Sequence, residues 1–289
     1  GDQPDDLVFE LAQQATFPDH PLGRPILGVE NTVRSIQRDD LVRFPSQHYA
    51  ANRTIVTVAG AFDRQAIIDL VSAWFEKSGG GQRPQYAPPV IGAPSVRTAA
   101  RKLEQTHLVL ARRTVDAMSD DRFAARIFAE IFGGGMASRL FQEVRESRGL
   151  AYTIDASCDQ YSDAGRISVY AGCAPVDAAE VVKLTQGIWS DLAANGPTEA
   201  ELARAKAIAA AQFAMAAEAP AARAGTAGYE LLTFGKLVSV EDVLARIGAV
   251  TIAEVRKIAA DTYRKPGIAS AVGPKAGLAA AEAFVSAPG

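Results

Sequence analysis

The sequence predicts an α+β protein made of two like units, each a mixed or antiparallel sheet packed by helices, with the first unit incomplete. Three observations lead to this fold class. Apolar residues follow helical spacing in some segments and alternate in others, which indicates both helices and strands. One pattern of residues occurs twice at a fixed distance, and a stretch rich in glycine and proline separates its two copies.

The repeated pattern consists of an acidic residue, a tyrosine nine positions later, and a predicted strand that ends in glycine. Its two copies are, in order, Asp40, Tyr49 and 55–60, then Glu254, Tyr263 and 268–273. The offset is the same for both named pairs, 254 − 40 = 263 − 49 = 214. It predicts that the second unit starts near residue 100, and that roughly a hundred residues of a complete first unit come before this sequence. A chance recurrence of a common α/β phrase is the alternative.

This repeat divides the chain into three predicted segments. Residues 1–78 are the C-terminal remnant of the first unit, residues 79–99 are a linker, and residues 100–289 are the second unit. The linker belongs to the Gly- and Pro-rich stretch 78–99.

The individual elements follow from periodicity and capping signals. In the first segment, helix 64–75 places Ile67, Leu70, Val71 and Trp74 on one face. After the linker we expect a strand at 107–112, helices at 121–132 and 138–145, a hairpin, a helix at 240–247 and a last strand at 268–272. Three further helices should start at Asp177, Thr198 and Thr251, because a glutamate follows each capping residue by three positions.

The hairpin is predicted from two alternating runs, 152–158 and 167–173, on either side of a short loop. If Asp159 lies opposite Arg166, then Cys158 lies opposite Ile167. Cys173 is then six residues further along, or roughly 20 Å away at about 3.3 Å per residue. We therefore expect both thiols to be free, as in a reducing compartment.

Composition excludes several function classes. The 289 residues are 48% hydrophobic and 22% charged, as in globular proteins with a core. The net charge of −3 argues against nucleic acid as the main partner. No apolar run reaches the roughly 18 residues of a membrane helix, so we expect a soluble chain without a membrane partner. We expect a cytoplasmic location, with the periplasm as the alternative, because the chain starts at Gly1 and its natural start is not in view.

The histidines do not form a metal-binding pattern. His20, His48 and His107 are too far apart in sequence to share a helical turn, and the sequence contains no His-x-x-Glu-His. We therefore expect no metal ligands in this chain. The sequence also contains no Gly-x-Ser-x-Gly motif for a serine nucleophile.

The run from Gly133 to Tyr152 is the most informative segment. Three glycines follow a helix, a second helix comes next, and Tyr152 stands where that helix passes into the hairpin. A phosphate-binding loop would need a following Gly-Lys-Ser/Thr, which is missing. A helix terminus with a flexible turn is the simplest interpretation of the glycines.

This run, GGGMASRLFQEVRESRGLAY, resembles the signature of the second domain in pitrilysin-type (M16) zinc peptidases, the family of bacterial processing proteases. Segments 17–28 and 196–206 agree with the same family. The resemblance implies two α+β domains of like fold. It also implies a zinc site in the first domain, built from a His-x-x-Glu-His motif and a second glutamate shortly before an Asp-x-Pro. Asp2-Gln3-Pro4 matches that Asp-x-Pro, so the zinc ligands would come before this sequence.

The resemblance also assigns roles to residues of this chain. Arg145 and Tyr152 match the family's arginine and tyrosine, seven positions apart, which donate hydrogen bonds to the developing oxyanion. Arg148 is out of that register and is assigned to packing. The glycines Gly133, Gly134 and Gly135 resemble, in shortened form, a loop that contacts peptide.

The expected function is therefore the substrate-binding portion of a zinc-dependent metalloendopeptidase, inactive and without zinc when this chain is alone. The expected partners are a peptide substrate and either a second copy of the chain, a second M16 chain, or an N-terminal fragment. One alternative is a non-catalytic peptide-binding subunit of a heterodimeric M16 peptidase. Another is a structural subunit like the core proteins of a respiratory complex.

Overall fold

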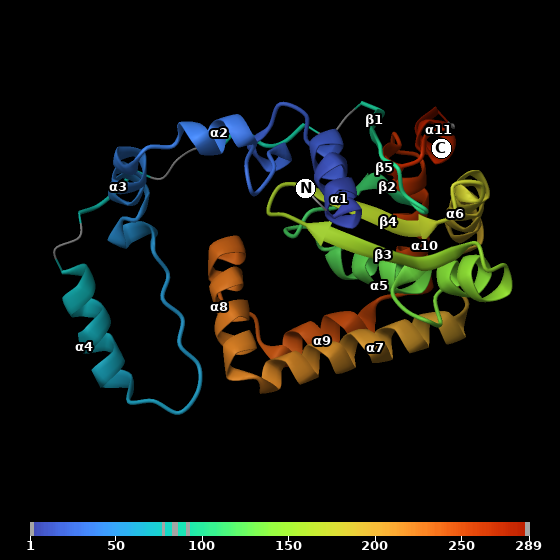
Figure 1. Cartoon of the computed structure of the whole chain (residues 1–289). Coiled ribbons are helices and arrows are strands. Elements are labelled where there is room, and N and C mark those ends of the chain that lie inside the picture. The colour runs from blue at the N-terminus through green and yellow to red at the C-terminus, as the bar shows by residue number, and fades with distance from the viewer. Residues whose placement is uncertain (1–2, 77–78, 83–85, 91–92, 287–289) are drawn as a thin grey trace. The chain divides into compact units, whose positions relative to one another are not determined.

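The structure is a computed structural model that describes residues 3–76, 79–82, 86–90 and 93–286. It separates into two compact units, each described here by itself (Figure 1). Unit 1 comprises residues 1–25, 88–210 and 243–289, and unit 2 comprises residues 26–87 and 211–242. The predicted division into 1–78, 79–99 and 100–289 stays a prediction. Asp2 of the Asp-x-Pro motif and part of the predicted linker lie outside the described residues.

Unit 1 is built on a five-stranded mixed sheet in the order β1-β5-β2-β4-β3. The strands are β1 (Ser95–Ala100), β2 (Thr106–Thr114), β3 (Ala151–Gln160), β4 (Gly165–Cys173) and β5 (Ile268–Gly273). β1 runs parallel to β5 and the other pairs are antiparallel. The predicted hairpin register is confirmed, because Cys158 pairs with Ile167 and Asp159 with Arg166. Both cysteines are free, as expected.

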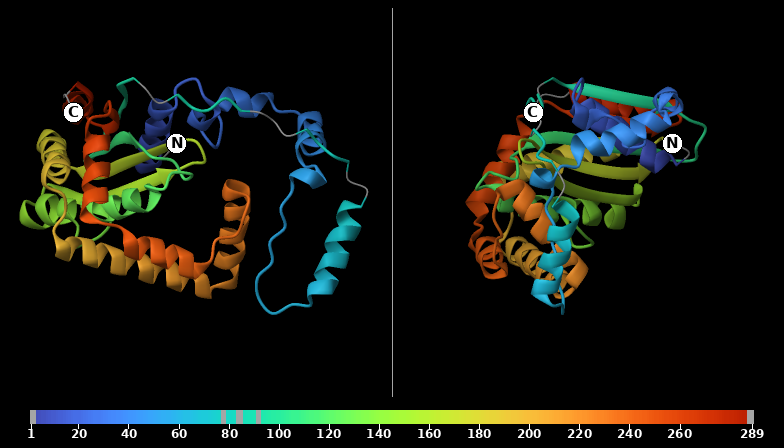
Figure 2. Two further views of the ribbon diagram at one scale, coloured as in Figure 1. Left: turned by 180° about the vertical axis from the view of Figure 1, so that it is seen from behind. Right: turned by 90° about the vertical axis from the view of Figure 1, so that its left-hand side faces the viewer.

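Helices cover both faces of this sheet (Figure 2). On one face, α1 (Pro4–Thr16) packs Val8 and Ala12 against Val109 and Val272. The other face is covered by α5 (Arg122–Gly133), α6 (Ala178–Asn195), α10 (Ile252–Tyr263) and α11 (Lys275–Ser286). The side chain of Arg112 is fully buried there, with its guanidinium over the rings of Trp189, Tyr263 and Phe284. The predicted α+β class with a mixed sheet packed by helices is therefore confirmed.

The predicted helix starts are confirmed at three positions. Thr198 and Glu201 exchange capping hydrogen bonds before α7 (Glu199–Glu218), and Thr251 and Glu254 do the same before α10. Asp177 stands at the N-terminus of α6 but makes no side-chain capping bond. α9 (Val240–Ala249) extends the predicted helix 240–247 by two residues. α7 and α9 each contribute residues to both units.

Unit 2 contains α2 (Glu30–Ser35), α3 (Arg38–His48), α4 (Arg64–Phe75) and α8 (Pro220–Phe234). The prediction of a strand at 55–60 is wrong: these residues form no strand. The corresponding strand of the repeat, β5, is held between β1 and β2, and no described residue of unit 2 supplies such neighbours. A single extended segment cannot satisfy its backbone hydrogen bonds by itself.

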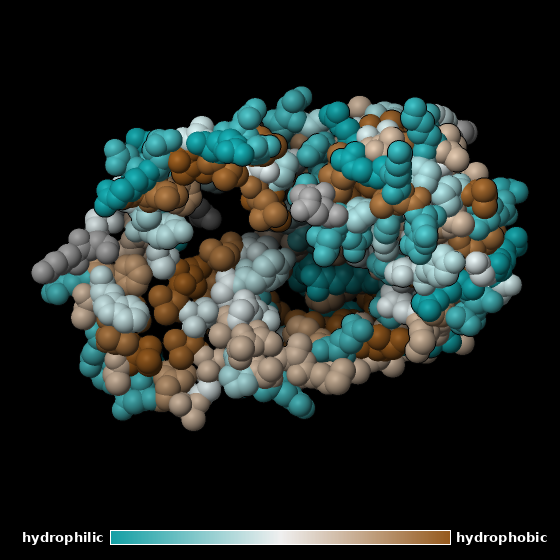
Figure 3. All heavy atoms as spheres, in the orientation of Figure 1, coloured by the Kyte–Doolittle hydropathy of each residue, from teal (hydrophilic) through white to brown (hydrophobic). Residues whose placement is uncertain are grey.

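Unit 2 exposes many large apolar side chains, which Figure 3 shows in brown. Among them are Ile26 (98% exposed), Leu27 (78%) and Trp74 (68%). Large exposed apolar side chains in such number are expected to be covered by a partner or by another segment of the protein. Among the described residues, no helix is long and apolar enough to cross a membrane.

Candidate functional site

The glycine loop, residues 133–138, begins where α5 ends and lies against the edge strand β3. Gly133 is buried, and a Cβ atom added there would stand 2.6 Å from the backbone nitrogen of Ala156 and 2.7 Å from its Cβ. Glycine is therefore required for the close approach of the loop to β3. Gly134 and Gly135 are exposed and available to a ligand.

The helix after the loop differs from the one predicted at 138–145. It begins at Arg139 and becomes a π-helix, η3 (Phe141–Ser147). Gly149, two residues after its end, has the left-handed conformation (φ 66°). Helical segments of this type are rare and often occur at functional sites. The exposed Arg145 lies in the last turn of η3, and its guanidinium carbon lies 4.8 Å from the centre of the Phe141 ring.

Tyr152 occupies an irregular position in the sheet. The register between β3 and β4 shifts between Ala151 and Thr153, which makes Tyr152 the extra residue of a β-bulge. A bulge redirects the side chain of the extra residue. Tyr152 is 68% exposed, and neither its hydroxyl nor the guanidinium of Arg145 has a hydrogen-bond or ion-pair partner within the described chain.

The three sequence-predicted groups thus come from neighbouring elements of unit 1. The loop packs on β3, η3 contacts β3, and Tyr152 is the second residue of β3. Arg148, which was assigned to packing, pairs with Glu143 at 2.7 Å and with Glu180 at 3.7 Å. Arg145 therefore differs from Arg148 in having no carboxylate partner among the described residues.

A partly buried ion-pair network links Arg139, the residue after the glycine loop, to α6 and α7. Arg139 binds Glu201 at 2.7 Å and Asp191 at 2.6 Å, and it also donates to the carbonyl of Gly196. Hydrogen bonding from Arg139 holds the pKa of Glu201 at about 2, against 4.5 for an ordinary glutamate. Sequence reasoning missed this network because residues 139, 191 and 201 share no motif. The capping position of Glu201 was the only part visible in the sequence.

Polar side chains also gather on the exposed face of β3 and its neighbour β4. Asp155 pairs across the strands with Tyr170, whose hydroxyl lies 2.9 Å from Nδ1 of His107. Burial raises the pKa of Asp155 and of Tyr170 and lowers that of His107, and Asp5 opposes the last of these shifts. These groups form a desolvated polar surface beside the bulge.

The histidines of the chain do not meet. His20 accepts a hydrogen bond from the Leu22 amide at 3.2 Å, His48 packs on the Phe44 ring, and His107 binds Tyr170. In the described parts of the chain, no group of three or more His, Cys, Asp or Glu residues could hold a metal ion. These residues do not fit a zinc site.

Comparisons with known proteins show the family of the chain. A family model described as the peptidase M16 inactive domain matches residues 35–209. Uncharacterized zinc proteases of Streptomyces coelicolor and Mycobacterium tuberculosis are 36% and 35% identical to the chain over 282 and 279 residues. Each match covers 94% of this chain but 61% and 64% of those proteins. The chain thus spans less than two thirds of their length.

Solved structures show the same fold. The peptidase M16 inactive domain from Pseudomonas fluorescens superposes with a TM-score of 0.83 at 25% identity, covering 94% of this chain and 66% of that one. A chain of complex III2 from Candida albicans superposes with a TM-score of 0.85 at 21% identity, covering 94% and 67%. The second likeness bears on the fold alone.

Proposed function

Because this chain belongs to the peptidase M16 family, we propose that it forms the substrate-side portion of a zinc endopeptidase, with Arg145 and Tyr152 as its catalytic donors. Its relatives are named zinc proteases, whereas the family model that it matches is the inactive domain. In this proposal the chain binds peptide and completes an active site whose zinc is held by another segment of the complete protein.

The observation that carries the proposal is the free hydrogen-bonding capacity of two residues on the contacting elements η3 and β3. Tyr152 is placed on a bulge at the start of an edge strand, and Arg145 lies at the end of the π-helix that leads into that strand. Both side chains are exposed and lack hydrogen-bond and ion-pair partners among the described residues. Functional donors are expected to be unpaired in this way before a ligand arrives.

The chemistry of peptide hydrolysis requires such donors. The carbonyl oxygen of the scissile bond gains negative charge when a nucleophile adds to the carbonyl carbon. The Tyr152 hydroxyl can donate one hydrogen bond to that oxygen, and the permanently charged guanidinium of Arg145 can donate another. The exposed backbone of Gly134 and Gly135 allows an extended peptide to approach closely. No step involving zinc is assigned to residues of this chain.

The proposal is tested by replacing Arg145 in the complete, zinc-loaded protein. We expect Arg145→Gln to lower kcat/KM for a fluorogenic peptide by about ten- to a hundredfold, because a charge-assisted hydrogen bond is lost. Arg148→Gln is the matched control, since Arg148 pairs with surface carboxylates and should leave kcat/KM within about threefold. Equal effects of the two substitutions would remove Arg145 from the site.

A further inference from the structure

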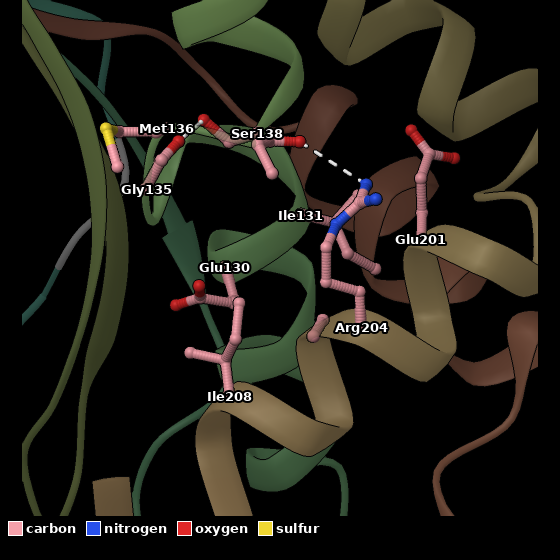
Figure 4. Close-up of a pocket in the computed structure, with 10 residues that line it drawn as sticks. Glu130, Ile131, Gly135, Met136, Ser138, Glu201, Arg204 and Ile208 are labelled. Atoms are coloured by element: carbon pink, nitrogen blue, oxygen red, sulfur yellow. Dashed lines mark hydrogen bonds between the residues drawn. The ribbon is translucent and has the colours of Figure 1, made fainter. Parts of the chain in front are cut away.

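A small pocket lies between the end of α5, the glycine loop and α7, entirely within unit 1 (Figure 4). Its volume is about 50 Å³. Its apolar wall consists of Ile131, Met136 and Ile208, and Gly135 of the loop borders it. Glu130, one turn before the end of α5, places a carboxylate beside this wall.

The carboxylate of Glu130 is partly buried, and no described residue neutralises its charge. No other described residue forms a hydrogen bond or ion pair with it, and burial raises its pKa. The pocket's other carboxylate, Glu201, is already bound by Arg139. The pocket's cation, Arg204, donates to the carbonyl of Ala137 at 3.4 Å, and Glu130 points away from it in Figure 4.

The carboxylate of Glu130 occupies space that is free because Gly134 of the glycine loop has no side chain. A Cβ atom added to Gly134 would stand 2.4 Å from a carboxylate oxygen of Glu130 and 2.6 Å from its Cα. Any larger residue at 134 would therefore displace the carboxylate. The loop that we propose to contact peptide thus also positions an unpaired negative charge next to that peptide.

We propose that this pocket binds the side-chain ammonium of a lysine in the bound peptide, with Glu130 as its counter-ion. The inference rests on the proposed function, because the peptide is held on the glycine loop. An apolar wall that ends at a carboxylate matches a lysine, whose methylene stem packs while its ammonium makes charge-assisted hydrogen bonds. The small volume favours the compact ammonium over the planar guanidinium of arginine.

Methionine methyl groups provide a direct readout of binding to this chain. The sequence contains three methionines, of which Met136 lines the pocket, while the exposed Met118 and Met215 are not among its lining residues and serve as references. The chain is labelled with ¹³C at the methionine methyl groups, and Met136→Leu assigns the signal. The probes are acetylated and amidated five-residue alanine peptides with a central lysine, norleucine or arginine.

We expect the lysine peptide to shift the Met136 signal saturably. The norleucine peptide has a similar unbranched stem without the charge and should bind about tenfold more weakly. Glu130→Gln should reduce lysine binding by about tenfold and leave norleucine binding unchanged. Arg204→Gln should tighten lysine binding, because it removes the repelling charge from the pocket. Equal binding of lysine and norleucine, unchanged binding in Glu130→Gln, or equal binding of arginine and lysine would each overturn the proposal.

The Met136 signal reports peptide binding without peptide hydrolysis, so it tests the lysine pocket separately from the proposed peptidase function. A lysine-dependent Met136 shift combined with full peptidase activity of the Arg145 variant would refute the proposed function and keep the pocket as a binding site. An unresponsive Met136 signal combined with a strongly impaired Arg145 variant would refute the pocket alone.

Discussion

Replacing Glu201 by glutamine tests how much the ion-pair network around Arg139 stabilises the folded chain. In the folded chain Glu201 accepts two hydrogen bonds from Arg139, at 2.7 and 2.9 Å, and both side chains are largely buried. Glutamine keeps the size of the side chain and can still accept the capping bonds at the start of α7. The substitution therefore removes the charge and one of the two oxygens that accept from Arg139.

The size of the effect follows from the pKa of Glu201, which is about 2 in the folded chain against an ordinary value of 4.5. A difference of 4.5 − 2 = 2.5, at about 1.4 kcal/mol per pKa unit, sets a ceiling of roughly 3 to 4 kcal/mol. Residual exposure and the second partner, Asp191, lower the expected loss of unfolding free energy to about 2 kcal/mol.

The pH dependence has a definite sign. A depressed pKa stabilises the folded state wherever the unfolded glutamate is ionised, so the stabilisation is complete above about pH 5.5 and is lost as the pH falls toward 2. The difference in unfolding free energy between the original chain and Glu201→Gln should therefore shrink to less than half between pH 7 and pH 3.

The assay is urea unfolding followed by the fluorescence of the buried Trp189, in a Trp74→Phe background that removes the exposed second tryptophan. Glu199→Gln, in the exposed first turn of α7, is the matched control and should change stability by less than about 0.5 kcal/mol. A loss below about 0.5 kcal/mol for Glu201→Gln, or the same loss at pH 3 and pH 7, would refute the reasoning.

Three further predictions concern packing, metal content and assembly. Gly133→Ala should lower the unfolding free energy by about 1–3 kcal/mol, because the added Cβ meets Ala156. Gly187→Ala is the control and should be neutral or stabilising, because a Cβ added there in α6 meets open space. Urea unfolding of both variants is the measurement. The chain alone should hold no stoichiometric zinc, and one tightly bound zinc per chain in metal analysis of the purified protein would contradict this. The exposed apolar side chains of unit 2 should be covered by a second copy or by a zinc-bearing segment, so light scattering should give a mass above that of a lone chain. A lone monomer with residues 1–78 fully protected from hydrogen exchange would refute that last expectation.

Local sequence signals predicted the elements of unit 1 that carry a signal of their own, whereas α1, β1 and α11 were not predicted. Alternation in the hairpin fixed the pairing of Cys158 with Ile167, and the Thr251–Glu254 box marked the start of α10. β1 overlaps the end of the predicted linker and carries little apolar alternation. Its place in the sheet comes from its pairing with β5. Residues 55–60 carry a clear strand pattern but have no described neighbours to pair with.

The site was predictable only in part, for a related reason. Arg145, Tyr152 and the glycines belong to one continuous motif, and a motif can be recognised without a fold. The bulge at Tyr152, the π-helical geometry of η3 and the desolvated carboxylate of Glu130 arise from packing between elements. Glu130 looks like an ordinary helix residue in the sequence, because nothing local shows that Gly134 and α7 enclose it.

The most direct test of the account is Tyr152→Phe in the complete, zinc-loaded protein, which removes one hydroxyl that has no partner among the described residues. We expect kcat to fall by about 10² to 10³, or about 3 to 4 kcal/mol of transition-state stabilisation, with zinc content, KM and unfolding free energy nearly unchanged. Tyr86→Phe, an exposed tyrosine between α4 and β1, should keep full activity. A Tyr152→Phe protein that retains full kcat would contradict the assignment of Tyr152 as a catalytic donor.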